Sequence, residues 1–325
     1  MVNRELIRLK ALQLIYAFHK NEGKSISAME KELFFSMSKA YDLYMTLLAL
    51  MVSLHTEAKR RLEILEETKI DDITRDTISL KAELTKFIQN KFITQLSRDP
   101  QLLTFLDNES NRWNNDIQFV RRLFNQIIQS KTYQKYAKQH TTRGFRYDED
   151  RELWRQIYKL FIEQNEEIDA LLEEKSIYWN DDKEIVDTFV LKTIKRFERG
   201  FVSGTQLLQN DINEETHDFA KRLIHDTLEH SDEYRTYINE ACQNWDIERL
   251  AYMDIIIMQM AISEMLTFPS IPVNVTINVY IELAKIYSTV NSSTFINGIL
   301  DAIARRLIEE RRMLKAMNRP RQNEL

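Results

Sequence analysis

Apolar residues recur at helical spacing along most of the chain and are densest over residues 250–307. Residues 245–266 are apolar nearly all round, which is typical of a buried helix. The sequence then turns at residues 267–272. Two further helices are predicted over residues 273–287 and 294–307, separated by a polar break at residues 288–293. This C-terminal stretch predicts the core around which the rest of the chain is organised.

The pattern before this stretch predicts further helices. Residues 3–20 form an amphipathic helix that we expect to end at Gly23. Ser27 and Glu30 have the spacing of a capping box, which predicts a second helix from about residue 29 to residue 65. Asp246 is placed to cap the central helix. Other helical patterns cover residues 78–97, 115–138, 150–174, 183–200 and 218–239.

The composition indicates the fold class. Only five Gly and four Pro occur in 325 residues, too few for many strands joined by tight turns, so an all-α fold is predicted. No run of about 18 apolar residues predicts a membrane span, and no secretory signal is expected. The single cysteine, Cys242, rules out a disulfide framework and fits a cytoplasmic protein.

Charge is distributed unevenly along the sequence. The net charge is −5, yet residues 1–24 carry +3 and residues 302–325 carry +4, leaving −12 between them. If the two ends meet in space, they would form an anion-binding surface on an acidic body. The alternative is that these charges lie on solvated helix faces and a basic tail.

No enzyme motif occurs in the sequence. The phosphate-binding loop, the dinucleotide-binding glycine pattern, the HExxH zinc motif and the GxSxG nucleophile motif are all missing. The six histidines are scattered, and the paired carboxylates lie on polar helix faces. We therefore expect a protein that is not an enzyme and has no cofactor and no metal site.

Two features of residues 250–307 exceed what packing requires. Asp254 lies on an apolar helix face, so it should either pair with a basic group of the chain or meet a donor of a partner. Residues 290–298 place hydroxyls and amides before a helix, which could bind a phosphate or simply cap the helix. Gly298 costs this helix about 1 kcal/mol, which predicts the close approach of another helix.

At these residues the sequence resembles the NusB family of transcription antitermination factors. The first helix is similar to the family's opening at Arg4, Arg8, Ala11, Gln13 and Tyr16, and Glu264 matches the end of the helix that precedes the signature. The C-terminal signature of the family is matched at Pro272, Val275, Ile277, Asn278, Glu282, Leu283, Ala284, Lys285, Phe295, Asn297, Gly298, Leu300 and Asp301.

The resemblance implies a NusB-like helical bundle with an additional inserted helical region. Residues 1–54 and 216–312 would form a discontinuous RNA-binding domain, residues 55–215 a helical insertion of unknown role, and residues 313–325 a basic tail. It also implies binding to boxA RNA of ribosomal RNA transcripts, together with the small-subunit ribosomal protein NusE. This pair would act in the antitermination complex of RNA polymerase.

The resemblance also assigns site residues. The expected partner-binding residues are Tyr16 and Asp254. The expected RNA-binding residues are Arg4, Arg8, Lys10, Lys285, Ser292, Ser293, Thr294, Phe295 and Asn297.

Departures from the family pattern leave a second hypothesis open. Val279 replaces a family glutamate, and Thr294 stands where a lysine is common. These changes and the acidic middle of the chain favour a NusB-like interaction scaffold that has lost specific RNA binding. An RNA methyltransferase carrying a NusB-like domain is a weaker alternative, because Cys242 precedes the central helix and no glycine-rich cofactor loop follows the signature.

Overall fold

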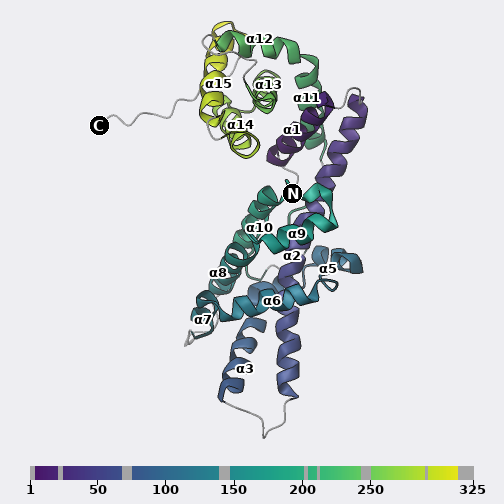
Figure 1. Ribbon diagram of the computed structural model, residues 1–325, viewed down its shortest axis with the longest axis vertical. Helices are drawn as coiled ribbons and strands as arrows, with labels where there is room; N and C mark the ends of the chain where they lie inside the picture. Colours follow the sequence, from purple (N-terminus) through teal and green to yellow (C-terminus); the bar gives the residue numbers. More distant parts are fainter. Residues whose placement is uncertain are drawn as a thin grey trace, which may run out of the picture. The chain divides into compact units, whose positions relative to one another are not determined.

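The computed structural model is built from helices (Figure 1). It describes residues 4–20, 25–67, 75–138, 147–200, 204–210, 213–242, 250–289 and 292–313. Over these ranges no strand is present, which agrees with the predicted all-α class. Likewise, no helix within them is long and apolar enough to cross a membrane.

The chain divides into two compact units. The terminal unit comprises Val2–Met37 and Asp211–Leu325, and the middle unit comprises Ser38–Asn210. Residues 38–54, which the resemblance grouped with the RNA-binding domain, therefore fold with the middle unit. The Tyr44 hydroxyl, for example, lies 2.8 Å from Oγ1 of Thr193.

The terminal unit is built around one buried helix. Apart from the start of α2, its helices are α1 (Arg4–Lys20), α11 (Glu214–Glu229), α12 (Ser231–Ala241), α13 (Tyr252–Thr267), α14 (Val273–Tyr287) and α15 (Ser292–Glu309). Helix α13 packs against all the other five and lies between them in Figure 1. Every residue from Asp254 to Met265 is buried, as its apolar sequence predicts.

The middle unit consists of α2 (Ile26–Glu66) from Ser38 onward and a series of shorter helices. Its core contains Phe87, whose ring lies 5.3 Å from the rings of both Phe124 and Trp154 and 5.5 Å from that of Tyr133. The shorter helices are α3 (Arg75–Ile88), α4 (Lys91–Leu96), α5 (Pro100–Leu106), η2 (Glu109–Asn111), α6 (Ile117–Gln129), α7 (Lys131–Lys138), α8 (Tyr147–Ile157), the π-helical turn η3 (Tyr158–Ile162), α9 (Glu166–Lys175), η4 (Ile177–Trp179) and α10 (Lys183–Arg196).

Several predicted helices are interrupted by polar residues. Asn90 caps α4 with its side chain and so separates it from α3. Ser130 divides α6 from α7, and His230 divides α11 from α12. The capping box was wrong by two positions, because Ser25 Oγ accepts from the backbone N–H of Ala28 at 3.2 Å while Ser27 lies inside α2.

Two further expectations for the terminal unit were wrong. The helix predicted over residues 245–266 begins later, because α13 starts at Tyr252 after an extended Ala251. Gly298 does not mark a close helix approach, because a Cβ added there would meet nothing within 4 Å. The expected cap Asp246 and the expected helix end at Gly23 lie outside the described residues.

Candidate RNA- and partner-binding surface

Helices α1 and α13 lie side by side and run in opposite directions. Arg8 of α1 contacts Glu264 near the end of α13, whereas Tyr16 contacts Tyr252 at its beginning. With a rise of about 1.5 Å per residue, these two levels lie roughly 15 Å or more apart along α13. The predicted RNA-binding residues therefore fall into two groups at different ends of the terminal unit, one on α1 and the other around the start of α15.

At the first end, Arg8 is buried in an ion pair. Its Nε and Nη2 atoms donate to the two carboxylate oxygens of Glu264 at 2.6 and 2.8 Å. Arg8 is 3% exposed and Glu264 fully buried. Thr276 Oγ1 and the Tyr280 hydroxyl also donate to this carboxylate, at 2.8 and 3.3 Å. The guanidinium is thus held inside the core.

The pKa of Arg8 reflects the same geometry. Burial opposes the positive charge, but the hydrogen bonds and the charge of Glu264 outweigh it, so the pKa of Arg8 lies above its ordinary value. Lys10 is buried as well. Arg4 remains partly exposed and pairs with Glu215 at 2.7 Å. Of these three predicted RNA contacts, only Arg4 reaches the surface.

At the second end, Asp254 is satisfied by hydroxyl groups. Ser292 Oγ donates to Asp254 Oδ2 at 2.9 Å, and Ser288 Oγ donates to Oδ1. Thr289 lies 2.7 Å from Ser292 Oγ, and it acts as the donor because the Ser292 proton is already directed at Asp254. Among the residues that the structure describes, no basic side chain pairs with this carboxylate, and Asp254 itself is buried. Through these hydrogen bonds, Asp254 ties the end of α14 and the start of α15 to the start of α13.

An aromatic cluster lies on the surface at the same end. The Tyr16 and Tyr252 rings are 6.1 Å apart, and His19 stands edge-on to Tyr252 at 5.8 Å. Lys20 Nζ lies 5.7 Å from the Tyr16 ring and 5.4 Å from the Tyr252 ring. Partial burial lowers the pKa of His19. Tyr252 could not be recognised from its spacing to Asp254, because residues two positions apart lie on nearly opposite sides of a helix.

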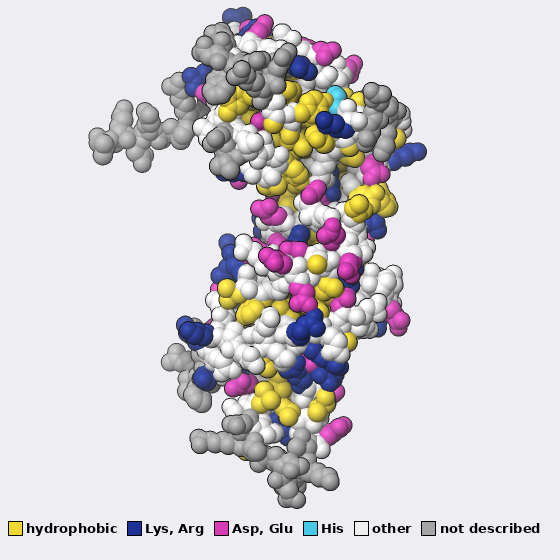
Figure 2. All heavy atoms as spheres, viewed as in Figure 1, with side chains coloured by type: hydrophobic (Ala, Val, Ile, Leu, Met, Phe, Trp, Pro, Cys, Tyr) yellow, Lys and Arg dark blue, Asp and Glu magenta, His cyan; other side chains and the backbone are white. Residues whose placement is uncertain are grey.

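The start of α15 and the end of α14 complete this end of the unit. Thr294 and Asn297 are exposed, Ser293 and Phe295 are half-buried, and Ser292 is buried. Lys285 is exposed and pairs with Glu282 of the same helix at 2.6 Å. Gln13 of α1 donates from Nε2 to the Tyr287 hydroxyl at 2.9 Å. Four helix ends therefore meet here, and Figure 2 shows hydrophobic side chains gathered on the visible face of this unit.

The sequence of the chain is similar to those of known proteins. The profile described as the NusB family matches residues 185–305. The transcription antitermination protein NusB of Geotalea daltonii is 37% identical over 130 residues, which cover 40% of this chain and 87% of that protein. The chain belongs to the NusB family. This membership agrees with the expectation that the protein is not an enzyme.

Other NusB proteins are matched over shorter stretches. That of Salinibacter ruber is 39% identical over 105 residues, covering 32% of this chain and 66% of that protein. The solved structure of T. maritima NusB is 31% identical over 36% of this chain and 72% of that chain, with a TM-score of 0.28. NusB relatives thus cover only part of this chain, and the matched profile begins inside α10 of the middle unit.

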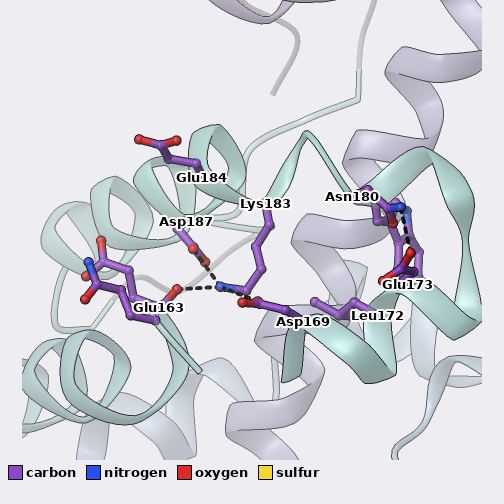
Figure 3. A pocket seen from close by; sticks show the side chains of 10 residues that line it. Glu163, Asp169, Leu172, Glu173, Asn180, Lys183, Glu184 and Asp187 are labelled. Carbon is purple, nitrogen blue, oxygen red and sulfur yellow. Dashed lines mark hydrogen bonds and ion pairs between the residues drawn. The ribbon is translucent and has the colours of Figure 1, made fainter. Parts of the chain in front are cut away.

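The middle unit of this NusB-family chain contains a polar pocket of about 480 Å³ around Lys183 (Figure 3). Lys183 Nζ lies 3.0 Å from Asp187 Oδ2 and 3.3 Å from Asp169 Oδ1, and it donates to the carbonyl of Glu163 at 2.5 Å. Burial raises the pKa of Asp187 to about 6, and Lys183 opposes that rise. These contacts occupy the ammonium group, so we assign Lys183 a structural role joining η3 to α10. Among the residues that the structure describes, no cluster of His, Cys, Asp and Glu has the geometry of a metal site.

Proposed function

We propose that this protein is a transcription antitermination factor that binds boxA-type RNA of ribosomal RNA transcripts together with the ribosomal protein NusE. The observation that carries the proposal is the meeting of four helix ends at one place. The Tyr16–Tyr252, Gln13–Tyr287 and Ser292–Asp254 contacts bring the start of α13 and the start of α15 together with the ends of α1 and α14. Family membership supplies the process, since the relatives are named transcription antitermination proteins.

The exposed part of α15 suits an RNA contact. Thr294 and Asn297 offer hydrogen-bonding groups at the surface, and Phe295 is half-exposed beside them. Single-stranded RNA is commonly bound by stacking of bases on aromatic rings and by hydrogen bonds to polar side chains. Lys285 lies on the last turn of α14, close in sequence to this surface. We assign the RNA contact to this group, with Ser292 as a supporting residue.

The aromatic cluster suits a protein partner. Tyr16 and Tyr252 present partly exposed rings, and tyrosines are enriched among residues that dominate binding energy at interfaces. We assign the contact with NusE to this cluster. Asp254 stabilises the start of α13, which carries Tyr252, through its hydrogen bonds with Ser288 and Ser292. RNA polymerase would then be reached through the assembled antitermination complex.

A titration tests the proposal. Labelled boxA RNA and a scrambled RNA are titrated with the full chain, with and without NusE, at one fixed salt concentration. We expect tighter binding of boxA, strengthened by NusE. Thr294→Glu should weaken RNA binding while leaving the fold intact, because a carboxylate in the first turn of α15 favours the helix but repels phosphate. Equal affinity for both RNAs would reject specific boxA recognition.

A specific observation favours the second candidate, an interaction scaffold without specific RNA binding. Arg8 and Lys10 are buried, and Lys285 is paired with Glu282, so these three predicted RNA-binding residues offer little uncompensated positive charge to an RNA. RNA affinity depends strongly on neutralising phosphates. The scaffold predicts that NusE binds while boxA and scrambled RNA bind equally poorly, so the same titration separates the two functions.

A further inference from the structure

Four arginines gather on the surface of the middle unit. Arg60 and Arg61 belong to α2, and Arg121 and Arg122 belong to α6. Figure 2 shows basic side chains collected on the visible face where these two helices lie in Figure 1. None of the four lies in the segment matched by the NusB family profile.

A buried carboxylate holds this cluster in place. Glu57 is 2% exposed and accepts from Nε and Nη2 of Arg60 and from Nε of Arg61, each at 2.7 Å. Arg121 Nε lies 3.8 Å from the same carboxylate. Arg61 also donates from Nη1 to Asn125 Oδ1 at 2.6 Å and from Nη2 to the carbonyl of Arg121 at 3.2 Å. The guanidinium groups are thus oriented before any ligand arrives, which lowers the entropic cost of binding.

The cluster keeps an excess of charge and donors. Four guanidinium groups pair with two carboxylates, those of Glu57 and Glu167, so the net charge is +2. A guanidinium carries five N–H donors. Arg60 directs two of them at Glu57, and its side chain is 39% exposed, so its remaining donors face outward. Planar donor groups in this arrangement match the oxygens of a phosphate.

Helices α6 and α7 add further basic residues around the arginine cluster. Residues 117–138, which span α6 and α7, contain five basic residues and no acidic residue, in a chain whose net charge is −5. The exposed face of α6 carries amides in addition to Arg122, namely those of Gln118, Asn125, Gln126 and Gln129. Arginine, asparagine and glutamine are among the side chains that contact nucleic-acid backbones and bases.

We propose that Arg60 and Arg121, oriented by Glu57, form together with Arg122, which pairs with Glu167, a second RNA-binding surface that contacts the phosphate backbone. The inference rests on the proposed RNA-binding function and extends it to the middle unit. Polyanionic RNA fits better than an acidic protein, because protein interfaces depend on large apolar or aromatic anchors and the described face of α6 exposes none. Backbone contacts of this kind add affinity without reading sequence.

The test compares two arginines in matched settings. Arg155 donates to Glu152 through the same two atoms and at the same 2.7 Å distances as Arg60 to Glu57, and its side chain is 37% exposed. The pair formed by Arg155 and Glu152 lacks the additional arginines around Glu57. Arg60→Gln and Arg155→Gln each remove a helix ion pair of the same geometry, although Glu152 is exposed where Glu57 is buried, and only the first reduces the charge of the cluster.

Binding of the full chain to a single-stranded RNA of about 40 nucleotides that contains boxA is measured by fluorescence anisotropy over a salt series. We expect Arg60→Gln combined with Arg122→Gln to weaken binding roughly tenfold at low salt and to reduce the salt slope of log K by about 1.4. Arg155→Gln should match the unchanged chain. Circular dichroism confirms that each variant is folded.

The outcomes separate this inference from the proposed function. If the unchanged chain prefers boxA and the double variant binds with the same affinity and salt slope, the second surface is rejected and the proposed function stands. If the double variant loses an acidic protein partner but keeps its RNA affinity, the surface binds protein and the RNA inference is overturned. If the unchanged chain binds no RNA, both proposals fall.

Discussion

Ser292 donates a hydrogen bond from its hydroxyl group to the buried carboxylate of Asp254, across 2.9 Å. The resemblance to NusB had assigned these residues to different partners, Ser292 to RNA and Asp254 to a protein. In the structure they form one contact between the starts of α15 and α13. Binding at the proposed RNA surface can therefore affect the proposed partner surface directly through this hydrogen bond.

The first prediction concerns the coupling of this pair. Ser292→Ala should reduce the free energy of unfolding by about 1 kcal/mol, and Asp254→Ala by about 1–3 kcal/mol, because the latter removes the carboxylate to which both Ser288 and Ser292 donate. Urea denaturation of both single variants and the double variant gives the interaction energy. We expect at least about 0.5 kcal/mol of coupling. Additive effects would show that the two residues act independently.

The second prediction separates a structural arginine from an RNA-binding one. Arg8→Met leaves the Glu264 charge buried without its counter-ion, which should cost about 3–5 kcal/mol of unfolding free energy. The control is Arg4→Gln on the same helix, whose exposed pair with Glu215 should be worth less than about 1 kcal/mol. Thermal denaturation followed by circular dichroism measures both. A stable Arg8→Met protein with weakened RNA binding would instead support the role that the resemblance implied.

The local apolar pattern of the sequence predicted the helices well. The contacts between side chains from different helices could be identified only in the structure. The apolar residues of α13 were sufficient to predict a buried central helix, because periodicity reports burial directly. The same pattern could not show that Arg8 meets Glu264, since 256 positions separate them in sequence. Asp254 was correctly recognised as unusual, but its hydroxyl donors come from other elements, Ser288 from the end of α14 and Ser292 from the start of α15. Breaks at single residues such as Ser130 were also missed, because the apolar pattern continues across them.

The third prediction tests the aromatic cluster as a partner surface. Tyr252→Ala removes a ring that contacts Tyr16, His19 and Lys20 at the surface. Binding to NusE, measured by calorimetry, should weaken by about 1–2 kcal/mol, since truncated interface tyrosines commonly cost this much. The exposed Val275 of α14 is a control, and Val275→Ala should have a much smaller effect. Unchanged affinity of Tyr252→Ala would move the partner surface elsewhere.

The fourth prediction is a pH dependence of the middle unit with two opposing contributions. Burial lowers the pKa of His55 to about 4, and the ring lies 2.9 Å from the Ile88 carbonyl. Since an unfolded histidine titrates near about 6.5, His55 contributes stability above that pH, and this stability is lost as the pH falls towards 4. Burial raises the pKa of Asp187 to about 6, so its contribution is present below about 4 and is lost as the pH rises through 6.

Single variants should therefore show slopes of opposite sign. Relative to the unchanged chain, acidification from pH 7 to 4.5 should make His55→Gln more stable by up to about 3 kcal/mol and Asp187→Asn less stable by up to about 2 kcal/mol. Tryptophan fluorescence in urea mainly follows the middle unit, because three of the four tryptophans, Trp113, Trp154 and Trp179, belong to it. The same slope in both variants would show that other groups govern the titration.

The last prediction concerns Gly298, whose place in α15 is open rather than crowded. A Cβ at this position would meet nothing within 4 Å, and Gly298 lines a groove of about 960 Å³ with Phe295 and Arg306. Gly298→Ala should therefore stabilise the terminal unit by about 0.5–1 kcal/mol through helix propensity. Gly204 is a matched contrast, because its surroundings are equally open but its φ is +80°. Gly204→Ala should cost about 1–2 kcal/mol of backbone strain. Thermal denaturation of both variants shows whether the backbone conformation or the free space at each glycine determines the effect. If Gly298→Ala destabilises the protein, another group occupies the groove in solution.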